Sequence, residues 1–219
     1  MTKDGIERQF GINHMGHFYL TNKLLPILKQ NKTRIINLSS SAHRESLCPA
    51  DVMKKVVNLN TFNGPIPDKI PYKMSGFVYY GISKLANVLF TRQLNKLYHK
   101  DGITSLCLHP GAIITDLQRN MPMGILYVIM WVRYGYRMKT IPRGAATTLR
   151  CITISDKEIY NGNMNDIDDM ALYFDNCRPQ NYNMNKDFKN GKNTDIDQAL
   201  WDYSCRVIQS LDYLKLNNV

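Results

Sequence analysis

Closely spaced cysteine pairs and long apolar runs are both missing from this chain of 219 residues. The cysteines are odd in number and far apart, so we expect neither a disulfide framework nor a metal cluster; they are Cys48, Cys107, Cys151, Cys177 and Cys205. A membrane-spanning helix needs about 18 to 20 consecutive apolar residues, whereas the longest apolar run covers only residues 125–132. Reduced thiols and the lack of a signal peptide predict a cytoplasmic location.

Acidic residues are scarce relative to basic ones, with 18 Asp and Glu against 28 Lys and Arg, and the formal net charge is +10. Such a balance could attract nucleic acid, an anionic membrane surface or a phosphorylated ligand. The basic residues are scattered, however, and no zinc-finger or RNA-binding aromatic motif is present, so we expect no nucleic-acid partner. A hydrophobic content of 44% is ordinary for one soluble globular domain spanning the chain.

A helical pattern over residues 76–92 is the most informative feature that is present. Its apolar residues recur at the spacing of a buried helix face, at Ile82, Leu85, Ala86, Leu89 and Phe90. On such a helix Tyr80 and Lys84 lie one above the other. An ammonium group within about 4–6 Å stabilises a phenolate and lowers the tyrosine pKa from about 10. The pair could therefore act as a general acid and base.

The Tyr-x-x-x-Lys spacing does not identify a site by itself. Tyr19 with Lys23 and Tyr182 with Lys186 match the same pattern. A tyrosine and a lysine four residues apart are more often chance neighbours on one helix face. The surrounding sequence has to distinguish the three pairs.

Three short apolar runs predict the strands of an α/β fold, at residues 34–38, 103–108 and 170–174. The Tyr80 helix connects the first two, which makes a right-handed parallel crossover. The first run ends in Ser39 to Ser41, where open α/β sheets bind ligands, although a serine run is more often a turn. The second ends in Pro110 and Gly111, a turn that brings backbone groups close to a ligand.

Helices are expected at both ends of the chain. The first covers residues 4–30, with Asp4 and Glu7 as its capping box. Two glycines around Asn13 predict either a local kink or an asparagine turned toward a site. The other expected elements are a helix over residues 142–154, a loop over residues 176–193 and a last helix capped by Thr194 and Asp197.

Two long segments have no clear secondary-structure pattern. Residues 42–75 are rich in Asn, Pro and Lys, and they predict an insertion loop. Residues 117–141 combine methionines and other apolar residues with Arg133, Arg137 and Lys139. That composition suits a substrate lid or a membrane-facing segment, and it suits a core helix equally well.

Together these motifs resemble the short-chain dehydrogenase/reductase superfamily, and within it the retinol dehydrogenase group and the WW-domain oxidoreductases. The resemblance runs nearly end to end. It is carried by Phe10-Gly-Ile-Asn-His-Met-Gly-His17, Ser39-Ser-Ser-Ala-His43, the 80–92 helix, His109-Pro-Gly111 and Ala199-Leu-Trp201. It implies the C-terminal part of a Rossmann-type doubly wound parallel sheet, with about three strands and flanking helices.

The resemblance also implies roles for single residues. Tyr80 would be the general acid and base, and Lys84 would lower its pKa and hold the nicotinamide ribose. Ser40, chosen over Ser39 by its place in the motif, would hydrogen-bond the reacting oxygen. Asn13 would anchor a water that links Lys84 to solvent.

The cofactor expected from the family is NADP(H), with NAD(H) left open. Backbone from Pro110 and Gly111 to Ile113, together with Thr115, would hold the carboxamide end of the cofactor. The substrate would be a hydrophobic alcohol or its aldehyde or ketone. Contact with a membrane surface, at the cytosolic face of the endoplasmic reticulum, and a homodimer are further expectations.

A glycine-rich phosphate-binding turn, which the family uses to grip the cofactor pyrophosphate, is missing from the sequence. We therefore expect a truncated domain of 219 residues that lacks its N-terminal cofactor-binding half and leaves one edge of the 34–38 strand unpaired. Two alternatives stay open beside a retinol dehydrogenase-like oxidoreductase. They are an inactive fragment and a non-catalytic interaction protein that retains half of the fold.

Overall fold

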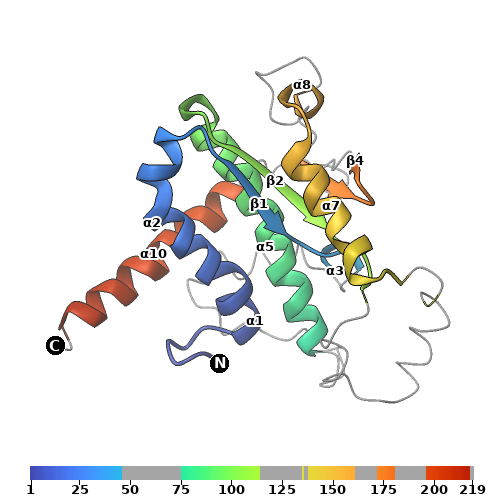
Figure 1. Cartoon of the computed structure of the whole chain (residues 1–219). Coiled ribbons are helices and arrows are strands. Elements are labelled where there is room, and N and C mark those ends of the chain that lie inside the picture. Colours follow the sequence, from blue (N-terminus) through green and yellow to red (C-terminus); the bar gives the residue numbers. More distant parts are fainter. Residues whose placement is uncertain (46–74, 114–134, 136–137, 161–171, 181–195, 218–219) are drawn as a thin grey trace.

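The computed structural model describes residues 1–45, 75–113, 135, 138–160, 172–180 and 196–217, which form an α/β fold (Figure 1). Helices separate the three parallel strands along the chain, as parallel pairing requires. In chain order the elements are α1 Arg8–Phe10, the π-helix η1 Gly11–Met15, α2 Gly16–Gln30, β1 Arg34–Leu38, α3 Ala42–Glu45, α5 Ser75–Tyr98, the 3₁₀-helix η3 His99–Asp101, β2 Thr104–His109, α7 Ile141–Thr153, α8 Asp156–Ile159, β3 Tyr173–Asp175, β4 Arg178–Gln180 and α10 Ile196–Asn217.

The sheet has the strand order β1, β2, β3, β4. β1 and β2 are parallel, with Arg34 opposite Thr104 and Leu38 opposite Leu108. β2 and β3 are also parallel, in register from Cys107 onward. These are the three strands expected from the sequence, although β3 starts later than predicted. Within the described part of the chain, β1 pairs on one side only, which leaves its other edge open as expected.

β4 corrects the prediction of a loop after β3. It runs antiparallel to β3, with Arg178 opposite Asp175. Asn176 and Cys177 connect the two strands with positive φ angles of 50° and 62°, as in a two-residue type I′ hairpin turn. Such turns usually carry glycine at the second position, and Cys177 in its place hides the hairpin from a sequence-based prediction.

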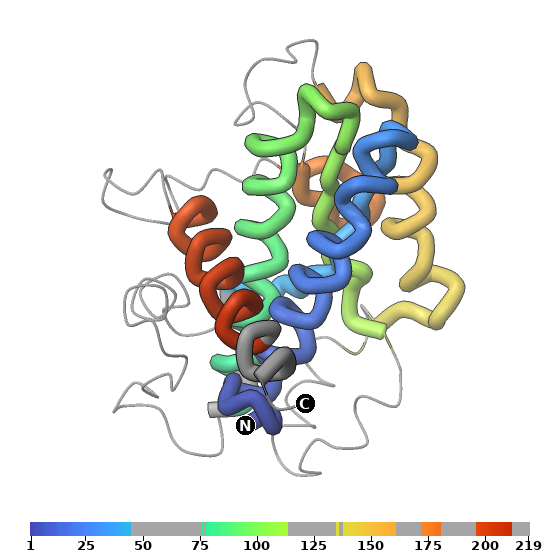
Figure 2. Tube along the Cα trace, turned by 90° about the vertical axis from the view of Figure 1, so that its left-hand side faces the viewer, coloured from blue at the N-terminus to red at the C-terminus, as the bar shows by residue number. Residues whose placement is uncertain are grey.

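Helices cover both faces of the sheet, in a Rossmann-type arrangement. In Figure 2, α10, α5 and α2 lie side by side on one face, and α7 lies on the other. The predicted apolar stripe of α5 is buried against α1 and α10, where Leu85 and Leu89 pack with Phe10 and Leu200. On the opposite face, Cys151 of α7 packs in a cluster with residues of β2 and β3.

The first helical segment is divided into α1, η1 and α2. Glu7 is itself the N-cap of α1, because its carboxylate accepts hydrogen bonds from the N–H groups of Gln9 at 2.9 Å and Phe10 at 2.8 Å. The capping box expected between Asp4 and Glu7 is therefore wrong. The irregularity expected around Asn13 is the π-helix η1, a form that is frequent at functional sites.

The last two predicted helices are present. α7 begins at the residue before Pro142, close to its expected start. Asp197 lies in the first turn of α10, where its side chain is 3% exposed and its Oδ2 lies 2.7 Å from Lys96 Nζ. Its expected capping partner, Thr194, lies outside the described residues. Asp197 therefore joins α10 to α5 across the helix layer.

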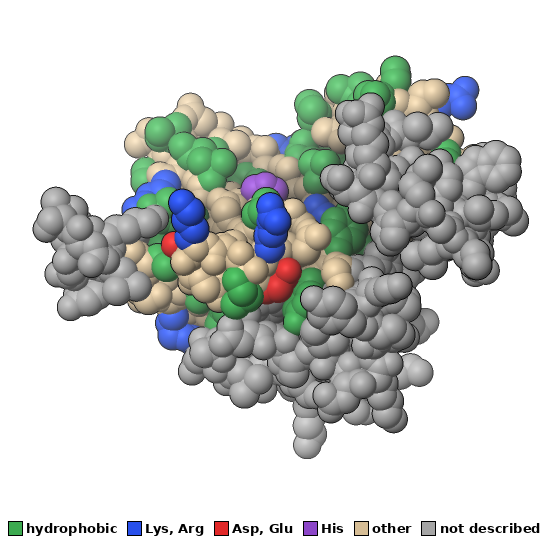
Figure 3. All heavy atoms as spheres, turned by 90° about the horizontal axis from the view of Figure 1, so that it is seen from below, with side chains coloured by type: hydrophobic (Ala, Val, Ile, Leu, Met, Phe, Trp, Pro, Cys, Tyr) green, Lys and Arg blue, Asp and Glu red, His purple; other side chains and the backbone are tan. Residues whose placement is uncertain are grey.

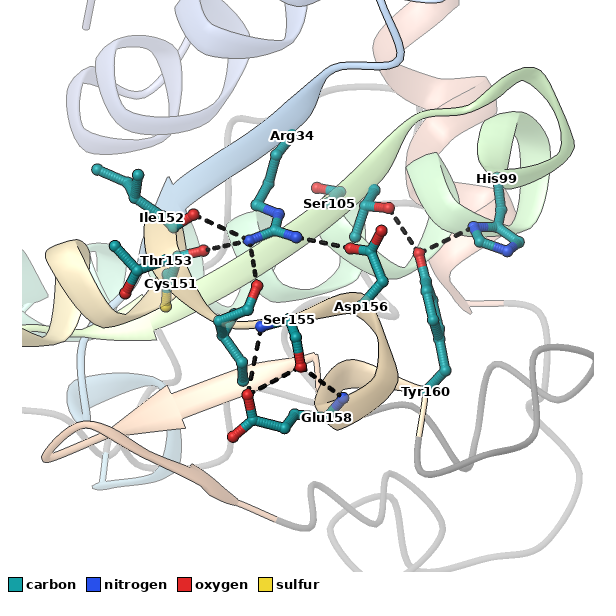
Figure 4. Close-up of polar contacts among 12 residues, drawn as sticks. Arg34, His99, Ser105, Cys151, Ile152, Thr153, Ser155, Asp156, Glu158 and Tyr160 are labelled. Atoms are coloured by element: carbon teal, nitrogen blue, oxygen red, sulfur yellow. Dashed lines mark hydrogen bonds and ion pairs between the residues drawn. The ribbon is translucent and has the colours of Figure 1, made fainter.

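Arg34 fixes the amino end of β1 to α7 and α8 (Figure 4). Its Nη1 donates to the backbone carbonyls of Cys151, Ile152 and Ile154 at 3.2, 3.0 and 2.7 Å. Its Nη2 lies 2.6 Å from Asp156 Oδ1. One guanidinium group thus binds the end of α7 and the start of α8.

A cavity of about 1410 Å³ opens at the amino ends of β1 and β2. Its lining includes Lys29, Lys32, Lys100 and Tyr160. Ligands of open α/β sheets bind at the carboxyl ends of the strands. Because this cavity lies at the opposite edge, we do not assign it to the candidate site.

Candidate active site

Tyr80 and Lys84 lie one turn apart on α5, beside the carboxyl end of β1. Lys84 Nζ donates a hydrogen bond to the backbone carbonyl of Leu38, the last residue of β1, at 3.2 Å. The same nitrogen lies 5.5 Å from the centroid of the Tyr80 ring. The strand end therefore holds the ammonium group next to the tyrosine ring. On the face of the molecule that Figure 3 shows from below, the described surface carries basic, histidine and hydrophobic side chains.

The two serines after β1 have different surroundings. Ser39 is 3% exposed, and its hydroxyl donates to the backbone carbonyl of Lys84 at 2.9 Å, which ties the strand end to α5. Ser40 is close enough to the Tyr80 side chain to lower the pKa of that tyrosine, and its Oγ accepts from the N–H of Ala42 at 3.3 Å. The structure thus brings Ser40 together with Tyr80 and gives Ser39 a buried, structural position.

Asn13 reaches the same helix from η1. Its Nδ2 donates to Ser83 Oγ at 3.0 Å and to Gln9 Oε1 at 3.2 Å. The Ser83 hydroxyl in turn donates to the backbone carbonyl of Tyr80 at 2.7 Å. Asn13 therefore contacts the residue before Lys84, and a water link from Asn13 to Lys84 stays a prediction.

Burial controls the pKa of both central groups. It raises the pKa of Tyr80, and the hydrogen bond with Ser40 opposes this shift in part. Burial lowers the pKa of Lys84, with an opposing effect from Cys107. The expectation that Lys84 lowers the pKa of Tyr80 is not met, because desolvation of the phenolate dominates and the ammonium binds the Leu38 carbonyl. Tyr80 is therefore held in its protonated form.

Sequence reasoning missed His17, which lies one turn after Asn13 on α2. Burial and the positive charge of Lys84 lower the pKa of His17, whereas a hydrogen bond to the backbone of Asn13 opposes them. His17 is nevertheless an exposed residue. The motif from Phe10 to His17 contained this histidine, but helical periodicity alone gave no reason to place it near Lys84.

The turn after β2 carries the other predicted site residues. Gly111 has a φ of +95°, in the left-handed region that favours glycine. The side chain of Ile113 packs on Gly144 of α7, where an added Cβ would lie 2.2 Å from Ile113 Cδ1. Pro110 precedes Gly111 at the end of β2, and Thr115 lies outside the described residues. The turn thus lies at the carboxyl end of β2, the edge at which open α/β sheets bind ligands.

Curated proteins similar to this chain include three dehydrogenases or oxidoreductases. Retinol dehydrogenase 12 from Mus musculus is 32% identical over 208 residues, which cover 94% of this chain and 56% of that protein. The short-chain dehydrogenase TIC 32 A, chloroplastic, from Brassica napus is 32% identical over 96% of this chain and 60% of its own length. A WW domain-containing oxidoreductase from Gallus gallus is 32% identical over 81% of this chain and 39% of its own length.

This chain belongs to the short-chain dehydrogenase/reductase superfamily. The similarity to these relatives runs through most of the chain and agrees with its Rossmann-type sheet. No protein-family profile matches it. The chain spans about half the length of the curated relatives that it matches.

The other Tyr-x-x-x-Lys pairs in this chain lack such surroundings or lie outside the described residues. Lys23 Nζ lies 5.1 Å from the centroid of the Tyr19 ring, nearly the same as in the Tyr80 pair. Pair geometry alone therefore does not distinguish a site. What distinguishes Tyr80 is its contact with Ser40 at the end of β1. Tyr182 and Lys186 lie outside the described residues.

The two long segments expected from the sequence fall mostly outside the described part of the chain. Of the insertion over residues 42–75, the start forms α3 and residues 46–74 are not described. The predicted lid over residues 117–141 is described only at residues 135 and 138–141. In the described ranges, no helix is long and apolar enough to cross a membrane, and no cluster of three or more metal-binding side chains occurs.

Proposed function

We propose that this chain carries the catalytic half of an NADP(H)-dependent oxidoreductase that interconverts a hydrophobic alcohol and its aldehyde or ketone. The arrangement that supports the proposal lies at the carboxyl end of β1, where the Leu38 carbonyl binds Lys84 beside the Tyr80 ring and Ser40 lies near the Tyr80 side chain. The names of the relatives, which include retinol dehydrogenases, support a hydrophobic substrate. NAD(H) remains the alternative cofactor.

Tyr80 performs the proton transfer in this proposal. In carbonyl reduction its hydroxyl donates a proton to the substrate oxygen, and in alcohol oxidation the phenolate accepts it back. Ser40 donates a hydrogen bond to the same oxygen and keeps it within reach of Tyr80. Lys84, which the Leu38 carbonyl holds beside the ring, has the binding of the cofactor ribose as its role in this proposal. A bound nicotinamide cofactor supplies or accepts the hydride.

The described residues fit the nicotinamide end of such a cofactor. The Pro110–Ile113 turn follows the carboxyl end of β2, where open α/β sheets bind ligands, and its backbone groups would hold the carboxamide. Thr115 would extend this contact. Lys84, fixed by the Leu38 carbonyl, would bind the ribose hydroxyls. The sequence contains no glycine-rich turn for the pyrophosphate, so we expect weak cofactor binding by this chain alone.

A non-catalytic interaction protein is the second candidate, and one observation favours it. The described surface of η1 and α2 exposes large apolar side chains, and β1 leaves a strand edge open beside them. Such surfaces are typical of contacts with other protein or a membrane. Homodimerisation and association with the cytosolic face of the endoplasmic reticulum belong to this proposal. The exposed residues are Ile12, Leu20, Leu24 and Ile27.

The test compares Tyr80→Phe with Tyr19→Phe in the purified chain. Reduction of hydrophobic aldehydes is followed by the loss of NADPH absorbance. Because general acid catalysis contributes about 100-fold or more, Tyr80→Phe should lower kcat/KM by at least that factor. Tyr19→Phe, which alters the second Tyr-x-x-x-Lys pair, should change it less than about twofold. Equal activity of wild type and Tyr80→Phe would contradict the proposed chemistry.

A further inference from the structure

Lys139 contacts the turn after β2 through both its backbone and its side chain. Its N–H donates to the carbonyl of Ala112 at 2.8 Å, and its backbone forms a parallel bridge with Ile113. Its Nζ donates to the carbonyl of Pro110 at 3.3 Å. These contacts join two parts of the chain that are separated in sequence by residues 114–138.

The side chain of Lys139 also covers Gly111. A Cβ placed on Gly111 would lie 2.8 Å from both Cε and Nζ of Lys139 and 2.9 Å from its Cδ. The lysine stem therefore occupies the space that a side chain at this position would need. Together with the packing of Ile113 on Gly144, this contact holds the turn from two sides.

The turn depends on such contacts because its own sequence gives it little rigidity. Gly111 can adopt many backbone conformations, and only outside contacts select the left-handed one. Burial lowers the pKa of His109 at the end of β2, and the charge of the nearby Lys139 ammonium lowers it further, whereas Asp175 opposes both. Both observations place the Lys139 charge at the base of the turn.

We propose that Lys139 is a positioning residue that holds the Pro110–Ile113 turn in the conformation needed to bind the nicotinamide end of the cofactor. The inference rests on the proposed function, since the cofactor contact of this turn is part of it. Lys139 acts through the turn and takes no part in proton transfer.

The first measurement needs no cofactor. Backbone amide hydrogen exchange of residues 108–113 is compared in the wild type, Lys139→Met, Lys139→Arg and the control Arg143→Met, which removes a neighbouring exposed charge at the start of α7. Loss of a charged hydrogen bond should raise exchange in Lys139→Met about tenfold. Lys139→Arg, which can still reach the Pro110 carbonyl, should restore most protection, and Arg143→Met should match the wild type.

The second measurement separates positioning from a general loss of stability. In variants with the wild-type urea midpoint, Lys139→Met should raise the KM for NADPH about tenfold and change kcat less than about twofold. Lys139→Arg should restore the KM. A variant that lowers kcat while leaving KM unchanged would overturn the positioning role.

The two measurements also separate this inference from the proposed function. Unchanged exchange in Lys139→Met, in a chain that binds NADPH, would overturn the role of Lys139 and leave the proposed function intact. Increased exchange in a wild-type chain that binds no NADPH would contradict the cofactor site, whereas the role of Lys139 in ordering the turn would stand.

Discussion

The side chain of Asn95 in α5 hydrogen-bonds a part of β2 with which β3 does not pair. Removing this side chain should destabilise the fold. β3 pairs with β2 only from Cys107 onward. Before that point, the backbone of Ser105 bonds to Asn95, whose Nδ2 donates to the Ser105 carbonyl at 2.8 Å and whose Oδ1 accepts from the Ser105 N–H at 2.9 Å. Nδ2 also donates to the Thr91 carbonyl at 2.9 Å. Asn95 itself is fully buried.

The magnitude follows from the backbone groups that Asn95→Ala leaves without a partner. Each unsatisfied buried group costs about 1–3 kcal/mol, so the N–H and carbonyl of Ser105 together cost about 2–6 kcal/mol. Asn95 lines the cavity at the amino ends of the strands, where water can replace part of the loss. We therefore expect a decrease of about 2–4 kcal/mol in the free energy of unfolding. In a domain of this size that lowers Tm by roughly 5–15 °C.

Urea unfolding followed by circular dichroism measures this loss, with Asn31→Ala as the matched control. Asn31 makes a similar side-chain bond to a helix carbonyl, that of Ile27 at 2.8 Å, but at an exposed position. We expect the control to lose less than about 1 kcal/mol. If Asn95→Ala costs no more than Asn31→Ala, the argument that this side chain replaces a strand contact is refuted.

Two further predictions concern the anchor of β1 and the pH dependence. Arg34→Met should lower the free energy of unfolding by about 2–3 kcal/mol, because the carbonyls at the end of α7 lose a charged donor. Asp156→Asn removes only an exposed ion pair and should lower it by less than about 1 kcal/mol. Equal losses of the two variants in urea unfolding would assign the whole effect to the ion pair. Because burial raises the pKa of Tyr80, more of this tyrosine is protonated at a given pH, so alcohol oxidation should keep rising above its ordinary pKa of about 10. A pH profile of kcat/KM that levels off near neutrality would contradict this assignment.

The sheet and helix α5 were predictable because their signals are local. β1 has the predicted bounds, and α5 buries the expected stripe, because runs of β-branched and apolar residues and a helical period are readable from single segments. The hairpin between β3 and β4 was missed because Asn176 and Cys177 lack the glycine that usually marks its turn. Glu7 was assigned to a capping box, although its own carboxylate caps α1.

The candidate site could be predicted in its members but not in its electrostatics. The motifs gave Ser40, Tyr80 and Lys84, which the fold brings to the end of β1. The direction of the Tyr80 pKa shift depends on burial and on where the Lys84 ammonium points, and neither is visible in a four-residue spacing. Lys139 was noted only as a charge beside the predicted lid. Its contact with the turn joins residues too far apart in the chain for periodicity to reveal.

Binding of NADPH to the purified chain, followed by the fluorescence of the reduced cofactor, tests the central claim most directly. The wild type should bind weakly but saturably, and Lys84→Ala should abolish the signal because it removes the cation held by the Leu38 carbonyl. Lys23→Ala, from the second Tyr-x-x-x-Lys pair, should bind like the wild type. Binding that is the same in wild type and Lys84→Ala, or no binding by folded wild-type protein, would contradict a cofactor site at the end of β1.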